Sequence, residues 1–188
     1  MIMPYNTAQL KHKLSLEVSR TFLRYVDIIS SQKDLPILDA PCGYGRHAFL
    51  LANMGCKVTC VDIDEKALDC VESNRKEYGF RKNQIVTKRL DLQKYTLTFP
   101  ENSFGAIVNI HYYQHNLLAK FIELLTPNGY LYFETPDNRG KNYLDLPIKG
   151  IIRNEIEKLC DFILYSEKLA GPSNLSRVTV KLLAKKRN

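Results

Sequence analysis

The residues best suited to bind a ligand are an acid and the two glycines that follow it in the sequence. Asp39 directly follows the apolar residues Ile37 and Leu38, and Gly43 and Gly45 come four and six residues later. Glycine has no Cβ atom, so the chain can turn sharply there and a ligand can approach the backbone. Residues 48–51 are apolar at helical spacing, and a helix N-terminus offers unpaired N–H groups and partial positive charge. The pattern predicts a strand, a glycine turn and a helix start that together bind an anionic group.

The glycine spacing admits two kinds of ligand. Gly43, Gly45 and Ala48 fit the dinucleotide fingerprint G-x-G-x-x-G/A, and Asp62 lies nineteen residues after Gly43, where that motif places a ribose-binding acid. Asp39 would repel a pyrophosphate, whereas it suits a cationic amino-acid head beside a ribose. The acid therefore favours a ligand that combines an amino acid with a nucleoside.

A family resemblance rests on the same stretch. The segment Asp39-Ala40-Pro41-Cys42-Gly43-Tyr44-Gly45 resembles motif I of the class I S-adenosylmethionine-dependent methyltransferases, whose usual form is acid-x-Gly-x-Gly-x-Gly. Pro41 replaces the first glycine. The resemblance covers residues 35–186, and residues 134–137 and 143–147 resemble a substrate-side loop of the small-molecule and tellurite-resistance-type branch. It implies S-adenosyl-L-methionine as the cofactor.

The resemblance also implies which residues bind that cofactor. Asp39 and the Asn109 carbonyl would orient the ammonium group, the loop backbone would hold the methionine part, and Arg46 would pair with the carboxylate or face solvent. Asp62 would bind the ribose, with a plain turn acid as the alternative. Asp91 would hold the adenine amino group or serve as a polar loop acid. The full predicted set is Asp39, Ala40, Pro41, Gly43, Gly45, Arg46, Asp62, Ile63, Asp91, Leu92 and Asn109.

The methyl acceptor is expected near a group of ring side chains. Residues 104–110 form an apolar run of buried-strand type, which ends at His111-Tyr112-Tyr113-Gln114-His115. Ligands of open α/β sheets bind at the carboxyl ends of the strands. We predict His111 and Tyr112 as catalytic residues, with the His111 imidazole as a general base, although such a histidine more often only packs. The sequence lacks the Asn-Pro-Pro-Tyr pattern of enzymes that methylate base amines, so nucleic acid loses weight as a substrate.

The elements around these residues predict an α/β fold. Strands, acids and helices alternate as in a doubly wound, mostly parallel sheet, and strands at 161–168 and 175–184 form a C-terminal antiparallel hairpin. The resemblance implies a Rossmann-like methyltransferase fold in a single domain, at residues 35–188. Residues 1–34 would form a helical segment that covers the cofactor side, where Tyr5 or Arg20 could reach the ligand. Residues 136–158 are either a lid or a surface excursion.

Composition limits the remaining choices. The 188-residue chain is 45% hydrophobic and carries a net charge of +7, with its dense basic cluster at 185–187. No run of about 18 apolar residues and no signal-peptide core occur, so we expect a cytoplasmic protein. Five cysteines at 42, 56, 60, 70 and 160 lack metal-ligand spacing, so no metal is expected. We expect a monomer or homodimer.

The leading hypothesis is methyl transfer to a small-molecule acceptor by in-line displacement. The first alternative is an NAD(P)-dependent oxidoreductase that uses the same glycine loop. A catalytically silent protein that only binds the cofactor is the second, and RNA methylation has low weight.

Overall fold

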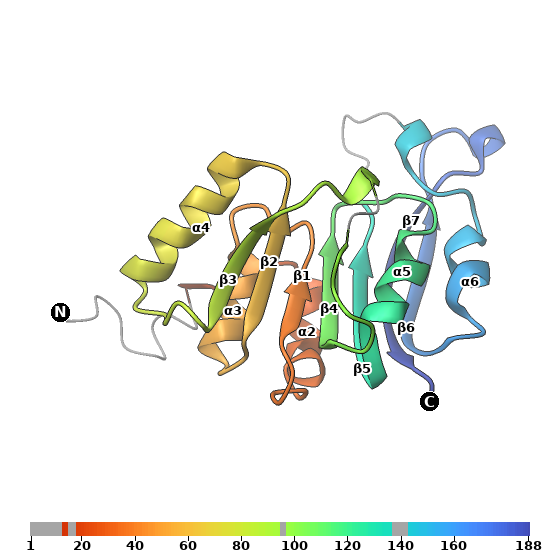
Figure 1. Cartoon of the computed structure of the whole chain (residues 1–188). Helices are drawn as coiled ribbons and strands as arrows, with labels where there is room; N and C mark the ends of the chain where they lie inside the picture. Colours follow the sequence, from red (N-terminus) through yellow and green to blue (C-terminus); the bar gives the residue numbers. More distant parts are fainter. Residues whose placement is uncertain (1–12, 15–17, 95–96, 137–142) are drawn as a thin grey trace. The chain divides into compact units, whose positions relative to one another are not determined.

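The computed structural model describes residues 13–14, 18–94, 97–136 and 143–188. The chain divides into two compact units, residues 1–97 and residues 98–188. Each unit is a layer of strands with helices against it (Figure 1). Tyr5 and the first part of the predicted 1–34 segment lie outside the described residues, so that domain boundary stays a prediction.

The first unit builds the glycine turn on three parallel strands. Strands β1 (Ile37–Asp39), β2 (Val58–Asp62) and β3 (Ile85–Arg89) are ordered β3-β2-β1, and Asp39 is paired with Cys60. Helix α3 (Arg46–Asn53) follows β1, and α4 (Glu65–Glu77) follows β2. Both helices contact β2 and β3. Because the strands run in one direction, Asp39 and Asp62 end neighbouring strands at one edge.

The second unit mixes parallel and antiparallel pairs. Strand β4 (Phe104–Ile110) is parallel to β5 (Leu125–Glu134), and β7 (Val178–Lys186) runs antiparallel between β5 and β6 (Cys160–Leu169). Helices α5 (Leu117–Leu124) and α6 (Ile151–Ile156) contact each other. Every residue of β4 is buried, as its unbroken apolar sequence predicted.

Short 3-10 turns mark the connections. They are η1 (Leu92–Lys94), η2 (Tyr143–Asp145) and η3 (Ser173–Leu175). The last one corrects the predicted second hairpin strand, which begins at Val178 and not at 175. Ser176 adopts a left-handed backbone with φ of 48°, which interrupts an extended chain at that point.

The N-terminal helical segment is interrupted where its sequence predicts a continuous helix. Apolar residues at three- and four-residue spacing predict one helix over 7–30, whereas residues 18 and 19 are not helical and α2 spans Arg20–Ile29. The Ser19 hydroxyl accepts a hydrogen bond from the Phe22 N–H at 3.4 Å and so caps the helix. Phe22 then packs edge-on against His47 of α3, with ring centroids 4.8 Å apart. The Ser19 cap therefore sets the start of α2, although the helical spacing of apolar residues extends further toward the N-terminus.

The sequence has a helical pattern over residues 154–159, and the structure moves this helix toward the N-terminus. Helix α6 starts at Ile151, because Gly150 takes the left-handed backbone (φ 83°) that precedes it, and ends at Ile156. Among the described residues, no helix is long and apolar enough to cross a bilayer.

Candidate active site

The glycine loop of the first unit has the tight geometry that its sequence predicts. Gly43 and Gly45 both have positive φ, 51° and 79°. A Cβ atom on Gly45 would lie 2.9 Å from Cγ2 of Val71 and 3.1 Å from the Phe49 ring, whereas one on Gly43 would meet nothing within 4 Å. Packing therefore requires glycine at 45, and open space lies beside the backbone at 43. The Ala40–Pro41 peptide bond that leads into the loop is cis.

Asp39 is a buried acid at the entry to this loop. Its side chain is 1% exposed, and no described residue forms a hydrogen bond with its Oδ2 atom. Burial raises the pKa of Asp39 from 3.8 to about 8, against the lowering effects of the Ala48 backbone N–H and the Arg46 charge; Asp62 adds a smaller raising effect. A buried carboxyl oxygen without a partner is costly unless a donor arrives. The ammonium group of an amino acid is such a donor.

Asp62 holds the loop in place. Its Oδ2 accepts a hydrogen bond from the Gly43 N–H at 2.8 Å, and its Oδ1 accepts one from the Asp64 N–H at 3.0 Å. The carboxylate thus connects the end of β2 to the turn after β1. Each oxygen keeps a second lone pair for a ribose hydroxyl. The sequence predicted the ribose role and gave no sign of this link.

The other predicted cofactor residues of the first unit differ in exposure. Ile63 is 56% exposed and Leu92 is buried, so Ile63 is the more accessible of the pair predicted to hold the adenine. Asp91 Oδ1 accepts the Gln93 N–H at 2.9 Å, and its side chain is 22% exposed. Ala40 is buried, Pro41 is half-buried, and Arg46 is exposed at the start of α3. Their cofactor roles stay predictions.

The second unit carries the residues predicted on the acceptor side. Asn109 is fully buried within β4, and His111 follows the strand as an exposed residue with a φ of 64°. Tyr112 is half-buried and donates its hydroxyl proton to Gln114 Oε1 at 2.9 Å. His111 lines a pocket of about 220 Å³, and Tyr112 is not among the lining residues.

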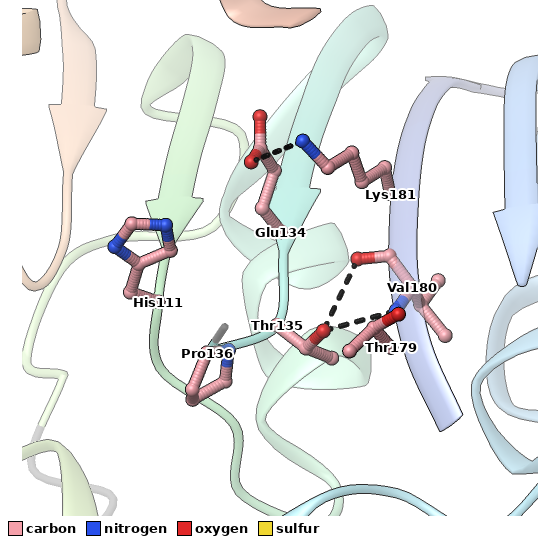
Figure 2. A pocket seen from close by; sticks show the side chains of 7 residues that line it. All are labelled: His111, Glu134, Thr135, Pro136, Thr179, Val180 and Lys181. Atoms are coloured by element: carbon pink, nitrogen blue, oxygen red, sulfur yellow. Dashed lines mark hydrogen bonds and ion pairs between the residues drawn. The ribbon is translucent and has the colours of Figure 1, made fainter. Parts of the chain in front are cut away.

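The sequence reasoning missed the ion pair that lies beside His111 in this pocket. Glu134 ends β5 and is buried, and its Oε2 lies 3.1 Å from the Lys181 Nζ (Figure 2). The two residues are direct cross-strand partners in β5 and β7. A buried acid at the end of a central strand could have been noticed in the sequence. Lys181 could not, because its register with Glu134 depends on the hairpin. The described residues contain no group of three or more metal-ligating side chains.

Comparisons with known proteins identify the family. The sequence model of the methyltransferase domain matches residues 37–129, which include the glycine loop and both acids that anchor it. The chain belongs to the class I S-adenosylmethionine-dependent methyltransferases. The family and cofactor predicted from motif I are thereby confirmed.

The relatives of this chain include two ubiquinone biosynthesis O-methyltransferases. The protein of Thiobacillus denitrificans is 26% identical over 133 residues, which are 68% of this chain and 56% of the relative. That of Nitrosococcus oceani is 30% identical over 129 residues, 65% of this chain and 52% of the relative. The chain therefore spans about half the length of these curated relatives.

A solved structure confirms the fold. TehB from Haemophilus influenzae matches with a TM-score of 0.69 over 90% of this chain and 63% of its own, at 19% identity. At that identity the likeness is one of fold. The predicted fold class, a Rossmann-like methyltransferase fold with a mostly parallel sheet and a C-terminal antiparallel hairpin, is confirmed.

Proposed function

We propose that this protein transfers a methyl group from S-adenosylmethionine to an oxygen atom of a small molecule. The observation that carries the cofactor part is the Asp39 Oδ2 atom, which is buried and has no hydrogen-bond partner among the described residues, beside a glycine loop with open space at Gly43. When bound, the sulfonium cofactor supplies a methyl group that is already activated for displacement. The protein must then align the reactants, exclude water and manage one proton.

The cofactor roles follow from the first unit. Asp39 accepts the ammonium group, and the backbone at Gly43 and Gly45 lies along the methionine part. Asp62 fixes the loop through the Gly43 N–H and accepts a ribose hydroxyl with its remaining lone pairs. Asp91 and the exposed Ile63 bind the adenine. The diphosphate of NAD has no ammonium group to donate to the buried Asp39 Oδ2, which disfavours the oxidoreductase alternative.

The oxygen acceptor is proposed from the relatives, whose names describe O-methyltransferases. An oxygen nucleophile must lose a proton during transfer, and His111, which follows β4, would accept that proton. We propose a small molecule as the acceptor, in keeping with the small-molecule branch that the sequence resembles. Nucleic acid is the minor alternative. We further propose that the protein is a monomer or homodimer in the cytoplasm. A reducing compartment suits its five free thiols.

Two measurements test the proposal. Calorimetric titration with S-adenosylmethionine should give heat of binding, while NADH in the same buffer should give none. Incubation with cofactor labelled in the methyl group and a panel of small hydroxyl compounds should then give labelled product. Binding of NADH alone would overturn the cofactor assignment. Cofactor binding without transfer to any panel member would favour the silent binding protein.

A further inference from the structure

The second unit has a pocket at the carboxyl ends of its parallel strands. It measures about 220 Å³ and is built from the end of β4, the end of β5 and the start of β7. Ligands of α/β sheets bind at this edge. Its lining residues are His111, Glu134, Thr135, Pro136, Thr179, Val180 and Lys181 (Figure 2).

The Lys181 ammonium group of this pocket is held in place by an ion pair with Glu134. Glu134 and Lys181 are opposite one another in the antiparallel β5–β7 pair, so their side chains share a face. The Lys181 Nζ lies 3.1 Å from Glu134 Oε2, and Tyr132 donates its hydroxyl proton to Glu134 Oε1. The Glu134 side chain is 3% exposed and that of Lys181 is 45% exposed. Both groups line the pocket, and the Lys181 ammonium group is the more exposed member of the pair.

The surrounding backbone is equally well fixed. The His111 N–H donates to the Glu134 carbonyl oxygen at 2.8 Å, and a φ of 64° is uncommon for any residue other than glycine. Such backbone positions cluster at binding and catalytic sites. Thr135 and Val180 exchange hydrogen bonds: the Thr135 N–H donates to the Val180 carbonyl oxygen at 3.0 Å, and the Val180 N–H donates to the Thr135 Oγ1 at 2.9 Å. The pocket therefore needs little ordering when a ligand enters.

We propose that this pocket binds the methyl acceptor and that the acceptor carries a carboxylate group which pairs with Lys181. The inference rests on the proposed methyl transfer. A carboxylate and an ammonium group form a charge-assisted hydrogen bond, and the Glu134 pair places the lysine before the ligand arrives. The half-buried Pro136 supplies apolar surface for the body of the acceptor. A neutral substituent forms a weaker bond with Lys181, and an ammonium substituent cannot pair with it.

Three phenols that differ in one substituent test this charge preference. They are 4-hydroxybenzoate, 4-hydroxybenzamide and 4-hydroxybenzylamine, which carry negative, zero and positive charge on the same ring. Binding to the protein saturated with S-adenosylhomocysteine is measured by ligand-observed NMR titration, and methylation by label transfer. We expect the benzoate to bind about tenfold more tightly than the benzamide, since Lys181 is partly exposed and screened. The benzylamine should bind most weakly.

Two lysines of β7 make a matched pair of variants. K181M should remove the preference for the benzoate while the affinity for S-adenosylmethionine stays unchanged. K185M, at the far end of the same strand, should keep both. Thermal melts confirm that both variants fold, and K181R should restore much of the preference.

The outcomes separate this inference from the proposed function. Failure of the wild-type protein to bind S-adenosylmethionine would refute the proposed function itself. Cofactor binding together with equal or reversed affinities for the three phenols would overturn the carboxylate assignment alone. An equal loss for all three phenols in K181M would also overturn it, because Lys181 would then act on the shared hydroxyl group.

Discussion

Replacing Asp39 with asparagine should change the pH dependence of stability. Burial raises the pKa of Asp39 to about 8, whereas the unfolded carboxyl titrates near 3.8. Between these values the folded protein binds more protons than the unfolded chain. Its free energy of unfolding therefore falls as pH rises through that window. Asparagine cannot ionise, so the free energy of unfolding of the variant does not fall in this way as pH rises.

The size of the effect follows from the interval between the two pKa values. Each pH unit inside the window lowers the free energy of unfolding by about 1.4 kcal/mol, so the wild type should lose about 3 to 4 kcal/mol between pH 5 and pH 8 relative to D39N. The amide group replaces an oxygen that has no partner among the described residues, and burying its N–H donors costs about 1–3 kcal/mol at every pH. The variant should therefore be similar in stability to the wild type or weaker at pH 5, and the more stable protein at pH 8.

Urea unfolding at pH 5, 6.5 and 8 measures this difference. D69N, on the exposed face of α4, serves as the control and should follow the wild type at each pH. Parallel stability curves for D39N and the wild type would refute the reasoning, because the folded Asp39 would then titrate like an unfolded one.

The same carboxyl should report cofactor binding. An ammonium group beside Asp39 favours the charged form, so S-adenosylmethionine should release a proton when it binds at pH 7. Calorimetry in two buffers of different ionisation heat measures that proton. D39N should release none and should bind the cofactor at least about tenfold more weakly. Unchanged affinity in D39N would show that the ammonium group binds elsewhere.

Further substitutions test the loop and the pocket. G45A should lower the free energy of unfolding by at least about 2 kcal/mol in urea titrations, because its Cβ would collide with packed side chains; G55A, also at positive φ but with open space, should cost less. D62A should cost about 2 kcal/mol and reduce cofactor affinity in calorimetry, since two backbone N–H groups lose their acceptor. Y132F should lower the melting temperature and leave Glu134 with one donor fewer; an unchanged melt would show that this hydrogen bond is not stabilising.

Local patterns predicted the parts of the fold that local physics decides. The β1 strand and its turn were predicted from an apolar run that meets two glycines, and both glycines adopt a positive φ. Asp64 is of a residue type that predicts a helix N-cap, and in the structure it accepts the Lys66 N–H at 3.0 Å where α4 begins. These signals depend on neighbours in the chain, so one sequence is enough to read them.

Other features depend on partners that are distant in the chain. The start of α2 was missed because apolar residues keep their helical spacing on both sides of Ser19. The Ser19 side chain caps α2, so the helix begins after it despite that spacing. The Glu134–Lys181 pair joins residues 47 positions apart, and it depends on the register of the antiparallel β5–β7 pair. A slip of one residue would turn Lys181 to the other face of the sheet. The pocket chemistry was therefore beyond sequence reasoning, although Glu134 itself ends a recognisable strand.

Asp62 shows why a correct motif can still leave a role incomplete. The dinucleotide spacing predicts it as a ribose-binding acid, but both of its oxygens also accept backbone N–H groups. The Gly43 N–H is one of them, so the acid that would meet the ribose also sets the loop that would meet the methionine part. Loss of Asp62 should then weaken both halves of the cofactor site together. A cofactor fragment without the ribose, such as methionine, should therefore also bind more weakly to D62A, which a role in ribose binding alone does not predict.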